Sequence, residues 1–363
     1  MENWQKNLQK NIHTIEELSD FIKMSEKEKE ELSQLLEKYP MSVTKYYLSL
    51  IDKNDINDPI RKICVPTVSE KSSEGRTDTS GELENTILPG LQHKYRETAL
   101  VLSTNACAVY CRYCFRKRLV GAENDEVVKS IDKVAGYIKN HTEINNVLIS
   151  GGDSFLMSNE RIEKYLEKFS DISHIDYIRF ATRVPVVFPE RITDDSNLIE
   201  IIRKFSEKKQ IYVVTHFNHP KECTEESAQA IGLLKNSGVI IKNQSVLLRG
   251  INDSPETLSD LFRKLVRMGV VPYYVFQCRP VKGVKNQFQV PLLEGCEIIE
   301  NTKRLLDGQE KAFRYIMSHV TGKIEIIGCL PNEKVLFKYH QAKDRKRLSK
   351  IFAREISPEQ CWL

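Results

Sequence analysis

The chain has 363 residues, of which 40% are hydrophobic and 29% are charged, a composition typical of a soluble globular protein with one large α/β domain and a smaller appendage. The 54 basic and 50 acidic residues give a net charge of +4, which argues against a nucleic-acid partner. No run approaches the ~18 apolar residues of a membrane span, and the first residues lack the apolar core of a signal peptide. Together with nine cysteines, this predicts a cytoplasmic protein without a membrane partner.

The N-terminal part of the chain shows helix signals followed by a long irregular stretch. Thr14 with Glu17, and Ser25 with Glu28, match capping boxes, in which side chains and backbone satisfy each other at a helix start. Residues 52–92 are rich in Asp, Asn, Ser, Gly and Pro, which predicts an irregular crossing segment. A stretch of that length is uncommon in a compact domain unless it is functional.

From residue 98 the pattern changes to alternating strands and helices. Short apolar runs lie at 99–103, 147–150, 177–181, 211–215, 239–248 and 270–276. Between them, apolar residues recur at helical spacing, as at Val127, Ile131, Val134 and Ile138. Six such units predict an α/β fold, a partial (β/α)6 barrel whose parallel strands are buried on both faces. Functional residues should then follow the carboxyl ends of the strands.

The last part of the chain is expected to form a tail of strands and a helix. RYIMSHV, KIEIIG and KVLFKYH predict strands, and the basic stretch after them predicts a helical end. We therefore expect three regions. A helical extension with its crossing segment occupies 1–92, the partial barrel occupies 93–290, and residues 291–363 complete the active site.

Three cysteines within eight residues constrain the chemistry more than any other feature. Cys107, Cys111 and Cys114 directly follow the first barrel strand with C-x3-C-x2-C spacing, and no fourth cysteine follows in register. A zinc site would need a fourth ligand, and His93 and His141 do not lie at metal-ligand spacing. A [4Fe-4S] cluster normally takes four thiolates, so three would leave one iron open to an exogenous ligand. The three cysteines could therefore bind an iron–sulfur cluster, contribute half of a zinc site, or be incidental thiols.

The cysteine spacing resembles the signature of radical SAM enzymes, in which the open iron binds S-adenosylmethionine (SAM). Ser150-Gly151-Gly152-Asp153 follows the second strand, where those enzymes place a turn that meets the methionyl amine of SAM, although SGGD alone is a common turn. CAVYCRYCFRKR, LISGGD, TRVPVVFPERIT, VVTHFNHP, NQSVLLRGINDS and PYYVFQC occur in an order that resembles the lysine 2,3-aminomutase family. That family combines the radical SAM cluster with pyridoxal 5′-phosphate (PLP) and moves an amino group between adjacent carbons.

The resemblance implies a PLP site. Lys323, in SHVTGKIEIIG, matches the lysine that holds PLP, although the family's glycine run is reduced to one glycine and a solvent-facing lysine is the alternative. Lys94 and Tyr95 match the segment that binds the phosphate, but Thr98 stands where that segment has an arginine. The further cofactor contacts that the resemblance implies are His216 and Gln244.

The resemblance also indicates which substrate to expect. Arg116 matches an arginine that binds the substrate α-carboxylate, for which a planar guanidinium is suited. Where lysine aminomutases hold the distal ammonium with two aspartates, this chain has Arg279 and Ser318-His319. A cation in place of carboxylates reverses the electrostatic preference of the pocket. We therefore expect a glutamate-like substrate rather than free lysine, unless Arg279 turns outward towards phosphate or a macromolecule.

These observations predict a radical SAM isomerase that uses a [4Fe-4S] cluster, SAM and PLP on a small amino acid. The resemblance implies that Lys323, Arg116 and Arg279 act in catalysis and that a flavodoxin or ferredoxin supplies the electron. One alternative is a PLP-free radical SAM enzyme acting on a peptide, RNA or another substrate, and a second is a non-enzymatic iron–sulfur carrier. The oligomeric state stays open, a homo-oligomer included.

Overall fold

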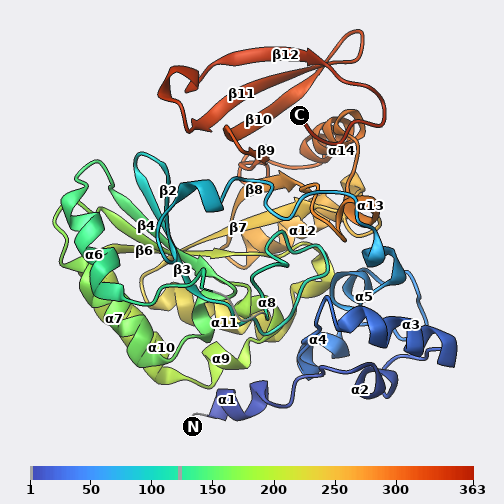
Figure 1. Ribbon diagram of the computed structural model, residues 1–363, viewed down its shortest axis with the longest axis horizontal. Coiled ribbons are helices and arrows are strands. Elements are labelled where there is room, and N and C mark those ends of the chain that lie inside the picture. Colours follow the sequence, from blue (N-terminus) through green and yellow to red (C-terminus); the bar gives the residue numbers. More distant parts are fainter. Residues whose placement is uncertain (1–2, 122–124) are drawn as a thin grey trace.

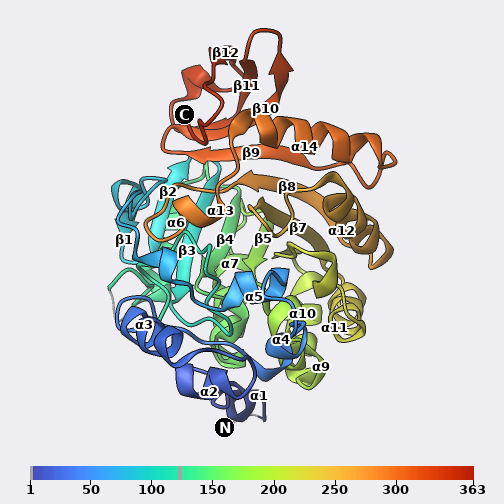
Figure 2. The ribbon, with the colours of Figure 1, turned by 90° about the vertical axis from the view of Figure 1, so that its right-hand side faces the viewer.

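The computed structural model describes residues 3–121 and 125–363, and one twisted sheet forms its centre (Figures 1 and 2). In the described chain its strands lie side by side in sequence order, from β1 to β12. Strands β3 to β9 run parallel, while β1 and β2 at one edge and β10 to β12 at the other are antiparallel. The two edge strands do not pair with each other, so the barrel stays open.

The strands are short, as is usual for a barrel. They are β1 Thr86–Leu88, β2 Leu91–Tyr95, β3 Thr98–Thr104, β4 Asn146–Gly151, β5 Tyr177–Ala181, β6 Gln210–Thr215, β7 Ile240–Leu247, β8 Val271–Gln277, β9 Arg314–His319, β10 Gly322–Leu330, β11 Lys334–Ala342 and β12 Ile351–Glu355. The helices are α1 Asn3–Leu8, α2 Ile15–Ser19, α3 Glu26–Leu36, α4 Lys45–Ser49, α5 Pro59–Cys64, α6 Ile131–Asn140, α7 Asn159–Ser170, α8 Val184–Val187, α9 Glu190–Thr193, α10 Ser196–Ser206, α11 Glu225–Asn236, α12 Pro255–Arg267, α13 Lys285–Phe288 and α14 Leu292–Arg304.

The prediction of a partial (β/α)6 barrel is confirmed. The six apolar runs coincide with β3 to β8, and helices follow each of these strands on the outer side of the sheet (Figure 1). In α12, Leu258, Leu261, Phe262 and Leu265 form a buried stripe at helical spacing, which packs the helix against the sheet. The sequence did not indicate that β9 would extend the parallel part of the sheet by one strand.

The N-terminal helices gather at the end of the molecule opposite β10 to β12 (Figures 1 and 2). The capping box of Thr14 and Glu17 is present, and Ser25 caps α3 by accepting a hydrogen bond from the Glu28 backbone N–H. The crossing segment is less irregular than expected, because it contains α5 and also β1, which pairs with β2 to begin the sheet.

The prediction of a helical C-terminal end is wrong. The basic stretch forms only a short 3-10 turn at Arg345–Arg347 and then the strand β12. β12 pairs with β11, and Phe352 lies opposite Phe337 with their rings stacked at a centroid distance of 5.3 Å. This pairing with a distant segment outweighs the local preference of the basic residues.

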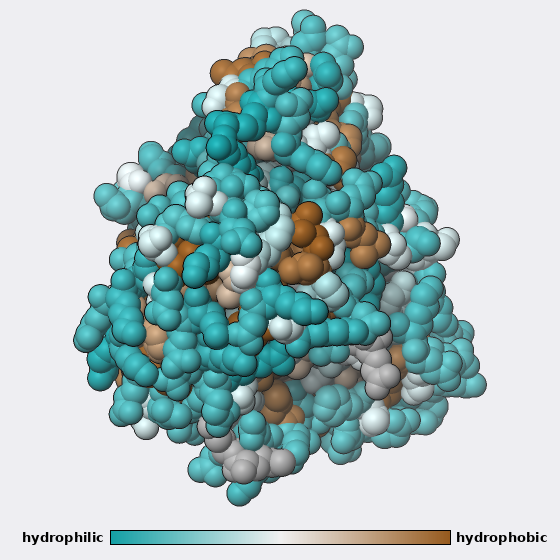
Figure 3. All heavy atoms as spheres, turned by 60° about the vertical axis from the view of Figure 1, so that its left-hand side comes forward, coloured by the Kyte–Doolittle hydropathy of each residue, from teal (hydrophilic) through white to brown (hydrophobic). Residues whose placement is uncertain are grey.

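The surface shown in Figure 3 is mostly hydrophilic, and its apolar side chains occur in small groups. Exposed large apolar residues in the described chain include Ile56, Leu83 and Ile351, which are far apart in the sequence. Among the described helices, none combines the length and apolar character that crossing a membrane requires.

Candidate active site

A cavity of about 360 Å³ lies inside the barrel, with walls formed by residues of β2 to β11 and of the loops that follow the parallel strands. Every candidate cluster, cofactor and substrate ligand predicted from the sequence lines it. These residues are Lys94, Tyr95, Cys107, Cys111, Cys114, Arg116, Ser150, Gly151, Gly152, Asp153, His216, Gln244, Arg279 and Lys323. The fold thus brings together residues that are more than 200 positions apart in the chain.

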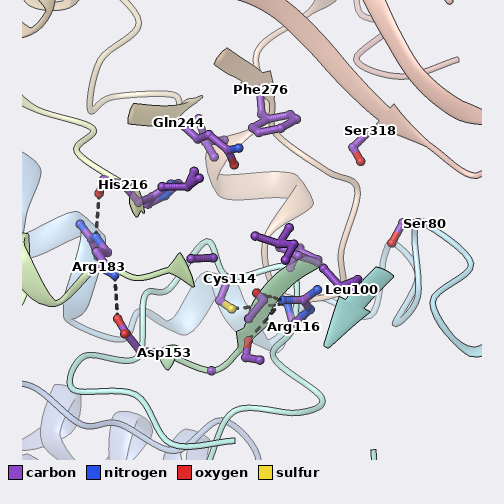
Figure 4. Close-up of a pocket in the computed structure, with 18 of the residues that line it drawn as sticks. Ser80, Leu100, Cys114, Arg116, Asp153, Arg183, His216, Gln244, Phe276 and Ser318 are labelled. Atoms are coloured by element: carbon purple, nitrogen blue, oxygen red, sulfur yellow. Dashed lines mark hydrogen bonds between the residues drawn. The ribbon is translucent and has the colours of Figure 1, made fainter. Parts of the chain in front are cut away.

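The three cysteines lie on the loop after β3, and their sulfurs interact with one another and with nearby donors. The Arg116 backbone N–H donates to Cys114 Sγ at 3.4 Å (Figure 4). Arg183 Nη1 donates to Cys111 Sγ at 2.6 Å. Burial raises the pKa of Cys114 to about 11, so the thiolate form would require a bound cation. Cys278 also lines the cavity but lies beside Cys361. Three sulfurs on one loop, two of them with N–H donors, fit an iron–sulfur cluster that lacks one protein ligand.

The SGGD turn packs against the cysteine loop. The Gly152 and Asp153 backbone N–H groups donate to the Thr104 and Ala106 carbonyls at 2.7 and 2.8 Å. A Cβ at Gly151 would lie 2.2 Å from the Thr104 oxygen, and Gly151 has a φ of +127°, so only glycine fits. The paired glycines are therefore needed for contact between the turn and the loop, whatever ligand the turn also meets.

Arg183, which the sequence did not single out, connects four parts of the site. Its Nε donates to the His216 carbonyl at 3.1 Å, and Asp153 accepts from its backbone N–H at 2.7 Å (Figure 4). Its Nη2 donates to Glu222 Oε1 at 2.5 Å. Burial and the charge of Arg183 lower the pKa of His216 to about 3. The His216 ring is therefore neutral, and its Nε2 lies 2.9 Å from the Tyr113 hydroxyl.

Two buried carboxylates of the crossing segment neutralise the cations of the cysteine loop. Glu70 accepts two hydrogen bonds from Arg112, at 2.6 and 2.8 Å, and one from Lys117 at 2.5 Å. Glu82 accepts from Arg116 Nε and Nη2, at 2.9 and 2.7 Å. Arg116 is thus buried rather than on the surface, and its Nη1 also donates to Ser150 Oγ at 3.0 Å. The crossing segment therefore has a structural role in the site.

Replacing Glu70 by glutamine is expected to lower the free energy of unfolding by about 3–5 kcal/mol, because two buried cations lose their counter-ion. Burial opposes ionisation of Glu70, but Arg112 and Lys117 lower its pKa below the usual value of 4.5. Its contribution should therefore be complete above pH 4.5 and disappear as the pH falls through the lower folded-state pKa. Urea denaturation followed by circular dichroism measures this. The control is Glu74→Gln, because Glu74 is an exposed residue that pairs with Lys285. This change should alter the free energy of unfolding little.

Lys323 lies at the other end of the cavity, near the start of β10, and faces the interior rather than solvent. Its Nζ lies 5.0 Å from the centre of the Tyr274 ring. Burial and the positive charges of Arg179, Arg279 and Lys94 lower the pKa of Lys323 to about 7. A neutral amine is the form that attacks an aldehyde such as that of PLP. The lysine and its surroundings therefore fit the group that the sequence predicted.

Lys94 and Arg279 also point into this end of the cavity. Lys94 Nζ donates to the Ser80 and His319 carbonyls at 2.9 and 2.8 Å. Arg279 Cζ lies 3.9 Å from the centre of the Phe115 ring, and its Nη2 donates to Ser318 Oγ at 2.9 Å. The Nη1 of Arg279 is buried without a hydrogen-bond acceptor in the described chain. The structure therefore turns Arg279 inward.

Four cations in this half of the cavity form no ion pair within the described residues. They are Lys94, Arg179, Arg279 and Lys323. Positive charge removed from water is costly unless an anion compensates it. The cavity is therefore suited to ligands with two separate anionic groups, such as a phosphate and a carboxylate.

Comparison with known proteins agrees with this arrangement. Residues 101–262 match the family model of the radical SAM superfamily. The chain is 40% identical to an Aquifex aeolicus protein provisionally called an L-lysine 2,3-aminomutase, over 97% of this chain and 94% of that protein. It is 41% identical to the L-lysine 2,3-aminomutase of Clostridium subterminale, over 83% and 71% of the two chains. It is 36% identical to the glutamate 2,3-aminomutase of Clostridioides difficile, over 84% and 72%.

Proposed function

The chain belongs to the lysine 2,3-aminomutase family of radical SAM enzymes, and from this membership we propose that it shifts the amino group of an acidic amino acid with the help of SAM and PLP. One observation carries the proposal. A single cavity holds three cysteines at one end and, at the other, a lysine whose pKa burial and neighbouring cations lower to about 7. A simple electron carrier needs neither that lysine nor the unpaired cations around it.

The residues of the cavity have separate tasks in this proposal. When bound, the cluster with SAM supplies a hydrogen-abstracting radical, and PLP supplies a ring that carries the migrating nitrogen. Cys107, Cys111 and Cys114 would hold the cluster, and Lys323 would hold PLP. The SGGD turn and His216, both fixed to the cysteine loop, would orient SAM. With substrate and cofactors bound, the cavity inside the barrel would limit the access of water to reactive species.

The substrate would lie between two arginines. Arg279 has one free buried nitrogen for a distal carboxylate, and Ser318 beside it supplies a neutral donor. Arg116 would bind the α-carboxylate, but two of its nitrogens already donate to Glu82. Glu82 must therefore share that guanidinium with the substrate or turn aside. A lysine ammonium beside Arg279 would meet like charge in a partly desolvated pocket, which disfavours free lysine.

The function is tested with protein reconstituted anaerobically with iron and sulfide and supplied with a reductant, PLP and SAM deuterated at the 5′ carbon. A panel of amino acids, with glutamate and lysine included, is incubated with it. We expect deuterium and a shifted amino group in glutamate, or in an amino acid with a similar distal group. Reductive SAM cleavage without PLP binding would favour the PLP-free alternative, and efficient turnover of lysine would contradict the substrate assignment.

Arg279→Gln is expected to raise the KM for the acidic substrate about a hundredfold, because a buried carboxylate would lose its charged partner. Arg279→Lys keeps the charge but not the planar fork, so its effect should be smaller. Arg314→Gln, an exposed change on β9 outside the cavity, is the control. Steady-state kinetics on the substrate found in the panel measure the change, and an Arg279→Gln enzyme with unchanged KM would rule out this role.

A further inference from the structure

Arg179 is a charged residue in the middle of the buried strand β5. Its neighbours Ile178 and Phe180 are fully buried on one face of the sheet, and side chains alternate along a strand, so Arg179 points to the opposite face. That face is the barrel interior, and Arg179 lines the same cavity as Lys323. An arginine in an otherwise apolar parallel strand needs a reason, because these strands are normally apolar on both faces.

The contacts of Arg179 leave part of its guanidinium without a partner. Its Nη2 donates to Asn146 Oδ1 at 2.5 Å, while its Nε is buried without a hydrogen-bond acceptor in the described chain. No carboxylate of the described residues forms an ion pair with it. A buried cation with a free donor and no counter-ion is expected where an anionic ligand binds.

The position of Arg179 is adjacent to Thr98. Thr98 Oγ1 donates to Asn146 Oδ1 at 3.2 Å, so Thr98 and Arg179 bind the same oxygen atom from either side. The strands explain this: Thr98 on β3 pairs with Asn146 on β4, and β4 pairs with β5. A guanidinium is therefore present beside Thr98, the position at which the family resemblance implies an arginine.

We propose that Arg179 binds the phosphate of PLP, supplying from β5 the guanidinium that is absent at Thr98 on β3. This inference rests on the proposed use of PLP. Lys94, on the strand next to β3, would provide a second cation for the same phosphate. Lys323, in the same half of the cavity, would hold the aldehyde end of PLP while Arg179 and Lys94 hold its phosphate, which fixes the ring between them.

Arg279 is less suited to the phosphate. Among the carboxylates, Glu82 has the strongest electrostatic effect on Arg279. A phosphate dianion bound to Arg279 would therefore be repelled by the negative charge of Glu82. The groups that interact electrostatically with Arg179 are tyrosines and the lysines Lys242 and Lys323, with no carboxylate among them. A dianion is therefore better accommodated at Arg179, and the single negative charge of a substrate carboxylate at Arg279.

The test compares PLP with pyridoxal, which has the same aldehyde but no phosphate. Apoprotein is titrated with each compound, and the bound fraction is measured by absorbance and by borohydride fixation. Arg179→Gln should weaken PLP binding about tenfold to a hundredfold, because a charge-assisted hydrogen bond to the phosphate is lost. The affinity for pyridoxal should stay within about twofold of the wild-type value. Arg179→Lys should lie between the wild type and Arg179→Gln. The control is Lys204→Gln, an exposed cation on α10 outside the cavity.

A rescue variant makes the test specific. In the double variant Thr98→Arg/Arg179→Gln, an arginine on β3 reaches the same site, so PLP affinity should recover at least tenfold over Arg179→Gln. Unchanged PLP affinity in Arg179→Gln, or an equal loss for pyridoxal, would overturn the inference because the role would then be structural. Wild-type protein that binds neither compound would overturn the use of PLP itself and this inference with it.

Discussion

Replacing any one of Cys107, Cys111 and Cys114 by alanine is expected to remove the cluster and abolish reductive cleavage of SAM. Each thiolate would hold a different iron, and the fourth cysteine that lines the cavity, Cys278, interacts with Cys361 rather than with these three. Two remaining thiolates do not retain a cluster that normally takes four ligands. Iron content, the absorbance of the reconstituted protein and the yield of 5′-deoxyadenosine measure the loss.

Cys329→Ala is the matched control, because Cys329 is exposed and does not line the cavity. It should keep full iron content and full cleavage. Circular dichroism of each variant separates loss of the cluster from loss of the fold. Normal SAM cleavage by the Cys111 variant would refute the radical SAM chemistry altogether.

Lys323→Ala is expected to abolish the covalent adduct that borohydride forms between PLP and the protein, while reductive SAM cleavage stays intact. Lys323 has the lower pKa of the two described lysines that line the cavity, about 7 against about 8 for Lys94, and the cysteines belong to a different part of the cavity wall. Peptide mapping by mass spectrometry identifies the modified residue. Lys242→Ala is the control, because burial also lowers the pKa of Lys242 although it lies outside the cavity. An adduct on another lysine would refute the assignment.

The pH dependence of this adduct gives a second measurement. Burial and nearby cations lower the pKa of Lys323 to about 7, far below the 10.5 of an ordinary lysine. The amine is protonated below that pKa and reactive above it, so the rate of PLP capture by apoprotein should rise between pH 6 and pH 8 and then level off. A rate that continues to rise towards pH 10 would show that the amine has an ordinary pKa.

The sequence predicted those parts of the fold that depend on local pattern. The strands β3 to β8 coincide with apolar runs, because strands buried on both faces are continuously apolar. The segment that forms β12 was predicted to be helical, because its sequence shows no alternation of apolar and polar residues. It becomes a strand through its pairing with β11. The helix α6 begins at Ile131 after its cap Ser130, so Val127 lies outside it.

The candidate site was predicted as a set of positions but not as a network. Motifs and the family resemblance identified residues that the structure brings to one cavity. They did not identify Glu82 as the partner of Arg116, or Arg183 as a donor to Cys111, because such pairings depend on segments that are distant in sequence. Arg179 did leave a signal. A charged residue between Ile178 and Phe180 interrupts a buried strand, and period-two alternation would have placed it inside the barrel.

The pairing of the cysteine loop with the crossing segment bears on how this chemistry could be moved between proteins. The C-x3-C-x2-C motif is short and contiguous, so it could be thought transferable to another protein by itself. However, the counter-ions of its Arg112 and Arg116 are Glu70 and Glu82, more than thirty positions upstream. A shortened chain starting at residue 93 would carry these cations into the interior uncompensated and should misfold. The smallest transplantable unit is therefore the motif together with both glutamates, and a scaffold that offers only a barrel cannot accept it.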